Sequence, residues 1–345
     1  MGWDVIAGQA LSEGRPTRRE LLAGATAAAV GMFARLGSAS GQQAASAPVA
    51  TQPRATTPAA CPWWMGEKHP RSRVVDVRSD KVLNASVPDP VALGELLDQA
   101  LCSLTDTATP ERAWRSVLGT ARRIVVKLNS VGADAIGTSD AMVRVLVGGM
   151  KDAGYDPGQI ALVEAPQYLT EVLGTRQPAR GWGPTIVVGG NPEPLAAYLH
   201  EADALINVPF LKTHQIAGMS ASLKNLSHAL IRHPARYHDN GCSPYVGQVV
   251  GSQEVSSKLK LNVVNALRVV VNNGPDARQQ DIVGYGGLLL GFDPVAVDTV
   301  GLEMLAVERR RGGLTGGRLD VRYLSSAGEA GVGHWRPGRL ERVGL

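Results

Sequence analysis

The feature of the sequence that most restricts its fold is a strand–helix–strand pattern between residues 124 and 164. The β-branched run at 124–129 predicts a buried strand, and residues 138–150 carry apolar side chains at helical spacing. Gly154 is expected to end that helix, and residues 159–164 predict the next strand. Strands joined through a helix pair in parallel, because only a long crossover returns the chain to the same edge. The pattern therefore predicts an α/β fold.

The same alternation continues along the rest of the chain. Further strands are expected at 74–78, 185–188, 204–208, 260–264 and 287–290, and further helices at 91–104, 193–201, 217–231, 294–307 and 321–330. This order predicts a doubly wound, mostly parallel sheet with helices on both faces. At 345 residues the chain is long enough to bury a large core of this kind.

The first forty residues have the pattern of an export signal. Arg18 and Arg19 precede fourteen uncharged residues at 21–34, and small residues follow at 37–39. The apolar run is shorter than the about 20 residues that span a bilayer. Residues 1–39 are therefore predicted to be a twin-arginine signal peptide, handled by the twin-arginine translocation machinery. We expect a periplasmic or extracellular protein with no membrane span after processing.

Residues 40–69 are expected to be a flexible linker, because they are rich in Ala, Pro, Thr, Ser and Gln. Residues 70–345 are expected to form a single α/β domain. The twin-arginine route carries folded proteins, which favours a bound cofactor without identifying it and leaves a divalent metal open. Cys61, Cys102 and Cys242 are too widely spaced for an iron–sulfur motif, and their spacing does not decide whether two of them form a disulfide.

Composition argues against nucleic acid as a partner. Aromatic residues make up 5% of the chain, too few for a surface of stacking rings. The net charge of +4 is located at residues 308–342, where eight Arg accompany four acidic residues. Such a segment is more often a solvated surface than a nucleic-acid groove. We therefore expect no nucleic-acid partner.

A polar pair ends the strand at 124–129, which is otherwise apolar. In doubly wound folds, ligands bind at the carboxyl ends of the strands, beside helix N-termini that attract anions. Lys127 and Asn129 occupy such an end and are candidate ligand-binding residues. The alternative is that Lys127 extends to solvent along an apolar surface.

A second polar group follows the strand at 204–208. Lys212 and His214 come just after this strand, and Lys224 and Asn225 lie on the predicted helix that follows. Two lysines can hold a carboxylate or phosphate, and a histidine beside them can transfer a proton. The alternative is that both lysines are solvated and that His214 is bonded to a backbone carbonyl.

Three further histidines lie close together in the sequence. His228, His233 and His238 are five residues apart, a spacing that does not place them on one helix face, and Pro234 interrupts any helix. A metal site on a helix is therefore excluded. A loop could still bring two of them together as metal ligands, and packing within loops is the alternative.

Two aspartates mark the predicted helix at 294–307. Asp293 followed by Pro294 is typical of a helix start, so Asp293 is expected to cap it. Asp298 lies one turn further, among apolar residues. There it either pairs with a lysine or a metal, or benefits from the helix dipole.

Taken in order, five short motifs resemble domain of unknown function family 362, over about residues 74–335. They are Val126-Lys127-Leu128-Asn129, Asn207-Val208-Pro209-Phe210-Leu211-Lys212-Thr213-His214, Ser222-Leu223-Lys224-Asn225, Asn273-Gly274-Pro275 and Asp293-Pro294-Val295-Ala296-Val297-Asp298. Residues 237–244 are similar to an exported branch of that family. The resemblance implies no established activity, but it singles out Lys127, Asn129, Lys212, His214, Lys224, Asn225, Asp293 and Asp298.

The chain departs from the family at three points. Some relatives carry an appended ferredoxin domain, whose cysteines this chain lacks. Asn265 stands where relatives often have Asp, and Phe210 stands where Lys is usual. The resemblance implies altered chemistry if the family's site uses either charge.

Two classes of function follow. The first is an enzyme that binds a small anion through Lys127, Asn129, Lys224, Asn225 and Asp293 and that acts on it with catalytic residues His214, Lys212 and Asp298. The second is a non-catalytic carrier or assembly factor that holds an anionic cofactor during export. The sequence contains no Walker loop, nucleophile elbow or dinucleotide fingerprint.

Overall fold

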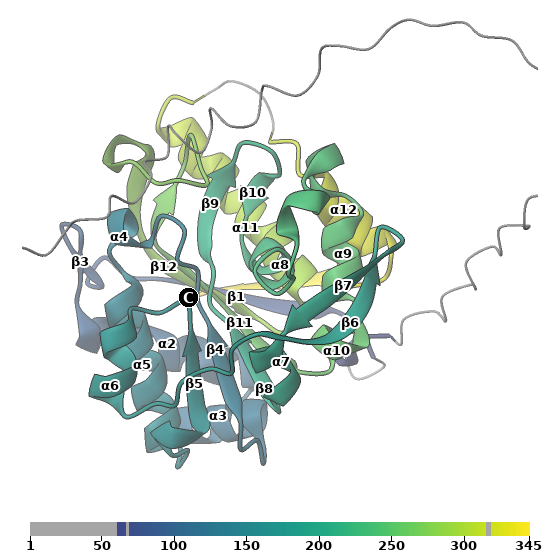
Figure 1. Cartoon of the computed structure of the whole chain (residues 1–345). Coiled ribbons are helices and arrows are strands. Elements are labelled where there is room, and N and C mark those ends of the chain that lie inside the picture. The colour runs from purple at the N-terminus through teal and green to yellow at the C-terminus, as the bar shows by residue number, and fades with distance from the viewer. Residues whose placement is uncertain (1–60, 67–68, 315–318) are drawn as a thin grey trace, which may run out of the picture. The chain divides into compact units, whose positions relative to one another are not determined.

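The computed structural model describes residues 61–66, 69–314 and 319–345. The predicted signal peptide, and the predicted linker as far as residue 60, lie outside the described residues. The predicted fold class is confirmed: a nine-stranded mixed, mostly parallel sheet carries helices on both faces (Figure 1). None of the helices in these ranges is both long and apolar enough to cross a lipid bilayer.

The main sheet has the order β13-β1-β12-β11-β8-β4-β5, with β9 beside β11 and β10 beside β9. Its strands are β1 (Ser72–Arg78), β4 (Ile124–Lys127), β5 (Ile160–Val163), β8 (Ala204–Asn207), β9 (Phe210–His214), β10 (Gly218–Ser220), β11 (Leu259–Val270), β12 (Ile282–Gly291) and β13 (Leu340–Gly344). Five of its strand pairs are parallel and three are antiparallel. Two small sheets pair β2 (Leu83–Asn84) with β3 (Val87–Pro88) and β6 (Trp182–Val188) with β7 (Asn191–Ala196).

The helices form two groups, one on each face of the sheet. On one face lie α2 (Pro90–Thr105), α3 (Pro110–Leu118) and α5 (Ser139–Asp152), and on the other α8 (Ser222–Ser227), α9 (Tyr245–Val250), α11 (Pro294–Arg311) and α12 (Arg322–Glu329). Shorter helices are α4 (Ala133–Ile136), α6 (Gln167–Leu173), α7 (Ala197–Glu201) and α10 (Gln253–Ser256).

The alternation of side chains along β4 explains why both faces are covered. Successive residues of a strand point to opposite faces. Ile124 and Val126 pack in the core under α2, α3 and α5, whereas Val125 packs in the core under α8, α9, α11 and α12. All three are fully buried. In a strand that is covered on both sides, every side chain before the end of the strand packs in a core and is apolar. The first polar side chain of β4, Lys127, therefore lies at its carboxyl end.

Two helices predicted from the sequence begin as strands, and only their later parts are helical. Residues 193–201 form part of a β6–β7 hairpin and only the short α7, because Pro192 and Pro194 disfavour a helix. The hairpin turns at Gly189 and Gly190, both with positive φ, as a two-residue turn requires. Residues 217–231 begin with β10 rather than with a helix. The chain reverses direction after β9, a strand that the sequence did not predict, and β10 pairs with β9 in antiparallel fashion. Strand β13 and helix α3 are also absent from the prediction.

Two tryptophans of the predicted linker contact the sheet domain. Trp63 Nε1 donates to the carbonyl of Leu259 at 2.9 Å. Trp64 is buried, and its Nε1 donates to the carbonyl of Val332 at 2.9 Å. These hydrogen bonds attach residues 63–64 to the start of β11 and to the segment after α12.

Candidate functional site

Three neighbouring strands end together at one edge of the sheet. Lys127, the last residue of β4, lies opposite Val163 of β5 on one side and opposite Asn207 of β8 on the other. Asn207 is also in register with Asn262 of β11. The predicted polar edge is therefore present, and α8 lies over it.

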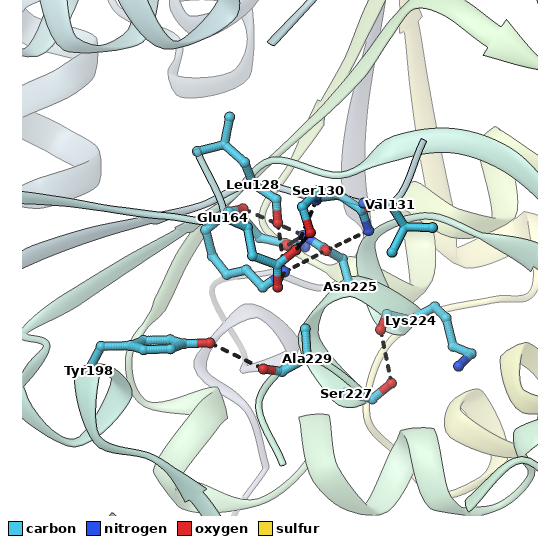
Figure 2. Close-up of polar contacts among 12 residues, drawn as sticks. Leu128, Ser130, Val131, Glu164, Tyr198, Lys224, Asn225, Ser227 and Ala229 are labelled. Atoms are coloured by element: carbon cyan, nitrogen blue, oxygen red, sulfur yellow. Dashed lines mark hydrogen bonds and ion pairs between the residues drawn. The ribbon is translucent and has the colours of Figure 1, made fainter. Parts of the chain in front are cut away.

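Lys127, which is fully buried, forms an ion pair with Glu164, whose side chain is 27% exposed. Figure 2 shows the contacts around Glu164. Its Nζ lies 2.9 Å from Glu164 Oε1 and donates to the carbonyl of Leu128 at 2.6 Å and to Asn225 Oδ1 at 2.9 Å. Burial lowers the pKa of Lys127, and Glu164 opposes that shift. Burial would raise the pKa of Glu164, but Lys127 and Ser130 outweigh it and lower that pKa. All three donors of Lys127 are thus used within the protein.

A chain of buried amides connects the strand ends to α8. Asn225 Nδ2 donates to Asn207 Oδ1 at 2.7 Å, and Asn207 Nδ2 donates to Asn262 Oδ1 at 2.8 Å. Asn207 Nδ2 also donates to the carbonyl of Ser222 at 3.1 Å. Because every amide in the chain has a partner, this network fixes the position of α8 over the sheet.

Lys212, on β9, is buried without an acidic partner. Its Nζ donates to Asn129 Oδ1 at 3.1 Å and to the carbonyl of Val131 at 2.7 Å. Among the described residues, no carboxylate oxygen lies within 4.0 Å of this nitrogen. Burial lowers the pKa of Lys212 to about 8, although the charge of Glu164 raises it.

Lys224, on α8, contacts a histidine and a cysteine. Its side chain is 6% exposed, and its Nζ lies 3.5 Å from His238 Nε2. Figure 2 shows its amino end pointing away from the contacts around Glu164. Burial lowers the pKa of Lys224 to about 8, although the neighbouring thiol of Cys242 raises it. As for Lys212, no ion pair with a carboxylate is found in the part of the chain that the structure describes.

His214, at the end of β9, is a neutral hydrogen-bond donor. Its Nδ1 accepts from the backbone N–H groups of Ile216 and Ala217, both at 3.2 Å, so the ring proton is on Nε2. The predicted alternative, a bond to a backbone carbonyl, is thus replaced by bonds to two backbone amides. Burial and then the charge of Lys224 lower the pKa of His214 to about 3. The imidazole is therefore neutral at pH 7.

The structure brings two of the three predicted histidines together and adds a cysteine. One ligand atom each of His228, His238 and Cys242 lies within 4.8 Å of the others, a donor set that could hold a soft cation such as Zn²⁺. The amino group of Lys224 lies against the same group, beside His238 Nε2, and competes with a cation for this place. His233 lies elsewhere, with its Nδ1 3.2 Å from Glu193 Oε1. All three cysteines are free thiols.

Asp298 caps α8 from the neighbouring α11. Its two oxygens accept the N–H groups of Ser222 at 2.6 Å and Leu223 at 3.1 Å. Burial raises the pKa of Asp298 to about 7, although these N–H groups lower it. No lysine is among its hydrogen-bond partners in the described residues. Asp298 therefore positions the helix that carries Lys224, where the sequence left a lysine, a metal or the helix dipole open.

Asp293 caps α11, as the sequence indicated. Its Oδ1 accepts the N–H groups of Val295 at 2.8 Å and Ala296 at 3.1 Å. Its Oδ2 accepts the hydroxyl of Ser72 at 2.6 Å and the N–H of His334 at 2.7 Å. Four donors thus occupy Asp293, and none of them belongs to the lysine cluster.

Phe210 and Asn265, two positions that the sequence analysis singled out, lie opposite each other. Phe210 of β9 is the register partner of Asn265 of β11, and both are buried. Asn265 Nδ2 donates to Thr138 Oγ1 at 2.9 Å, and Phe210 packs with Ile136.

Four residues of this region were not selected from the sequence: Glu164, Asn207, Asn262 and Cys242. Glu164 had a usable signal, because it ends the strand that follows the one ending at Lys127. Asn207 is likewise a polar residue at the end of an apolar strand. No sequence signal pointed to Cys242, because irregular loops bring it close to His228 and His238.

An open pocket of about 640 Å³ lies beside His214. Its lining includes Thr213, His214, Asn240, Asn273, Arg309 and Arg322. The pocket gives a path from solvent to the imidazole of His214. Its basic residues are Arg309 and Arg322, and Arg322 pairs at 2.7 Å with Asp320, which also lines the pocket.

Comparison with known proteins identifies a domain in the second half of the chain. Residues 190–303 match the sequence profile of a domain of unknown function, DUF362, a narrower span than the predicted 74–335. The matched span includes Lys212, His214, Lys224 and Asp298. No curated protein matches the chain.

Two solved structures are similar to this chain. The lactate racemase apoprotein from Thermoanaerobacterium thermosaccharolyticum has a TM-score of 0.39 and 12% identity, over 67% of this chain and 56% of that one. A protein from Thermotoga maritima has a TM-score of 0.33 and 12% identity, over 58% of each chain. This chain thus spans less than two thirds of either protein.

Proposed function

We propose that the protein binds a small anionic ligand, a carboxylate or a phosphate, between Lys212 and Lys224 and acts on it as an enzyme. The observation that carries this proposal is that both ammonium groups are buried without a carboxylate within 4.0 Å in the described residues. A buried charge is costly unless it is paired. Lys127 shows the contrast, because Glu164 neutralises it. A bound anion would do the same for the other two lysines.

Each polar residue of the site then has a distinct role. Lys212, oriented by Asn129, contributes charge from one side, and Lys224 contributes it from α8. The Nε2–H of His214 donates to the ligand and can stabilise negative charge that develops on it. A bound anion would also raise the pKa of His214, since the lysine charges that depress it would be compensated.

Ligand-dependent thermal unfolding tests this proposal. Sulfate and malonate should raise the melting temperature of the protein. Lys212→Met and Lys224→Met should each weaken the affinity at least about tenfold, since a hydrogen bond to a charged group contributes about 1.5–3 kcal/mol. The matched control is Lys151→Met, at an exposed lysine on α5. Equal stabilisation of all four proteins would contradict the proposed site.

The same site would serve a carrier that holds an anionic cofactor during export. The observation that favours this second function is the twin-arginine pattern at the N-terminus, because that route carries folded cargo. Native mass spectrometry of the protein as purified separates the two functions. A retained organic ligand of constant mass favours the carrier, whereas an empty protein that converts an added anion favours the enzyme.

Export through the twin-arginine route is part of the proposal and is supported by the sequence alone. Arg18 and Arg19 precede the weakly apolar run at 21–34. Changing both arginines to lysine should leave the precursor in the cytoplasm, as cell fractionation and immunoblotting would show. Normal processing of the double variant would refute the predicted signal.

A further inference from the structure

A second pocket lies at the opposite end of the sheet from the buried lysines. Strand β1 pairs with β12, and β12 pairs with β11, both in antiparallel fashion, so β1 and β11 run in the same direction. Strand β11 is parallel to β8, whose carboxyl end lies beside Lys127. The pocket, of about 750 Å³, is lined by Ser72 and Lys260 at the beginnings of β1 and β11. It therefore lies at the amino ends of these strands, and its volume is typical of a small-molecule site.

One wall of this pocket is an aromatic cluster of Trp63, His69 and Phe292. The ring centroid of Trp63 lies 5.6 Å from that of His69 and 5.3 Å from that of Phe292. The hydrogen bond from Trp63 Nε1 to the carbonyl of Leu259, at 2.9 Å, fixes the indole in place. Trp63 is nevertheless 37% exposed, although tryptophan is on average largely buried in folded proteins. The cluster thus offers a preformed surface on which a planar ring can stack.

The acidic side chains that line the pocket are already engaged within the protein. They are Asp106, Asp293 and Glu341. Asp106 and Glu341 both pair with Arg73, at 2.6 and 3.3 Å. Asp293 is buried and accepts hydrogen bonds from four donors at the start of α11 and beside it.

Three basic side chains of the lining, in contrast, have no acidic partner. They are Arg71, Lys260 and Arg339, and none of them lies within 4.0 Å of a carboxylate oxygen among the residues whose positions the structure gives. Lys260 Nζ lies 6.0 Å from the centroid of the Trp63 ring and donates to the carbonyl of Ser257 at 3.0 Å. An ammonium group has three donor hydrogens, so Lys260 can also donate to a ligand that lies against Trp63.

We propose that this pocket binds a planar aromatic ring that carries an anionic group, such as a carboxylate, sulfonate or phosphate. The ring stacks against Trp63 and Phe292, and the anionic group accepts hydrogen bonds from Lys260. Neither contact alone gives firm binding, because an ion pair open to solvent is weak and stacking adds only a modest gain. The combination selects an aryl anion over a neutral ring and over an aliphatic anion. The pocket is independent of Lys212 and Lys224, which lie at the other end of the sheet.

Isothermal titration calorimetry of the full-length protein with naphthoate tests the proposal. The matched probes are naphthylmethanol, which has the ring without the charge, and cyclohexanecarboxylate, which has the charge without an aromatic ring. Naphthoate should bind at least about fivefold more tightly than either probe. Lys260→Met should weaken the affinity for naphthoate at least about fivefold, because it removes a hydrogen bond to a charged group. Lys151→Met, at an exposed lysine on α5, should leave the affinity unchanged.

The aromatic wall is tested by two variants, Trp63→Leu and Phe292→Leu. Each removes part of the stacking surface and should weaken the affinity for naphthoate at least about threefold. Trp63→Leu also removes the hydrogen bond to Leu259, whereas Phe292→Leu leaves it in place. The melting temperature of each variant without ligand shows whether it is folded.

The outcomes separate this pocket from the site of the proposed function. Weaker binding of naphthoate to Lys260→Met and Phe292→Leu, but not to Lys212→Met, supports the proposal. Binding that is lost in Lys212→Met and kept in Lys260→Met locates naphthoate at the lysine site instead and overturns the proposal. Equal affinities for naphthoate and naphthylmethanol overturn the proposed ligand class. No measurable binding of naphthoate overturns the pocket as a site for aryl anions, and the function proposed for Lys212 and Lys224 stands or falls separately.

Discussion

The amino group of Lys127 lies 2.9 Å from a carboxylate oxygen of Glu164, at the ends of two adjacent parallel strands. Lys127 is fully buried, so its loss would leave Glu164, which is 27% exposed, and the oxygens of Leu128 and Asn225 without their charged partner. We expect Lys127→Glu or Lys127→Met to lower the free energy of unfolding by about 3–5 kcal/mol. Urea denaturation measures this loss.

The control for that experiment is Lys212→Met. It removes a buried ammonium that has no carboxylate partner, and relief of that cost offsets two lost hydrogen bonds. Its unfolding free energy should stay within about 1 kcal/mol of the parent value. A loss as large as that of Lys127→Met would show that Lys212 is structural.

The binding of sulfate should depend on pH through Lys212. The pKa of this lysine is lowered by burial to about 8, and a bound anion favours its charged form. Stabilisation by sulfate should therefore be greatest below pH 8 and decrease from pH 8 to 10, as the lysine loses its proton. Sulfate keeps a constant charge over this range, so the melting temperature with and without it gives the profile directly. A flat profile would exclude Lys212 as a ligand.

Without any anion, the same lysine should affect stability in the opposite direction. Between pH 8 and 10.5 the unfolded chain keeps a proton on Lys212 that the folded protein has lost. The unfolded state then binds more protons, so this residue makes the free energy of unfolding rise with pH. The rise should be smaller in Lys212→Met than in the parent protein.

Acid should destabilise the protein through His214. Burial lowers its pKa from 6.5 to about 3, so below pH 6.5 the unfolded chain binds a proton that the folded protein does not. The free energy of unfolding should therefore fall by up to about 1 kcal/mol per pH unit between pH 6.5 and 4. Urea denaturation at pH 7.0 and 5.5 measures it. Burial lowers the pKa of His228 to about 3 as well, so His214→Gln should reduce the dependence without abolishing it. His200→Gln, at an exposed histidine, serves as the control.

The strand–helix–strand pattern at 124–164 was enough to predict the fold class. A strand that is apolar at every position must be covered on both sides, and Ile124 and Val125 do pack in opposite cores. The pattern failed near Pro192 and at 217–220, where apolar spacing fits a helix but chain reversal forms hairpins. Hairpins depend on turn geometry at Gly189 and Gly190, which hydrophobic periodicity does not register.

The site was predictable where it depends on strand ends and not where it depends on loops. The rule that ligands bind at carboxyl strand ends selected Lys127, Lys212 and His214, and the structure places all three at one edge. It did not distinguish a paired lysine from unpaired ones, because that difference arises from Glu164 on a neighbouring strand. Lys224 lies on a helix and His238 lies in an irregular segment. No periodic pattern in the sequence predicts which residues of two such segments come into contact.

The last prediction concerns cation binding at His228, His238 and Cys242. Lys224 Nζ lies 3.5 Å from His238 Nε2, so its ammonium form repels a metal ion from the same place. We expect Lys224→Ala to bind Zn²⁺ at least about tenfold more tightly than the parent protein at pH 7, because the repelling charge is gone. Competition with a chromophoric chelator measures the affinity. Adding Cys242→Ser to Lys224→Ala should reverse the gain, whereas adding His233→Ala should not, since His233 lies beside Glu193 instead. Equal affinity in the parent and Lys224→Ala would show that the amino group does not occupy the cation's place.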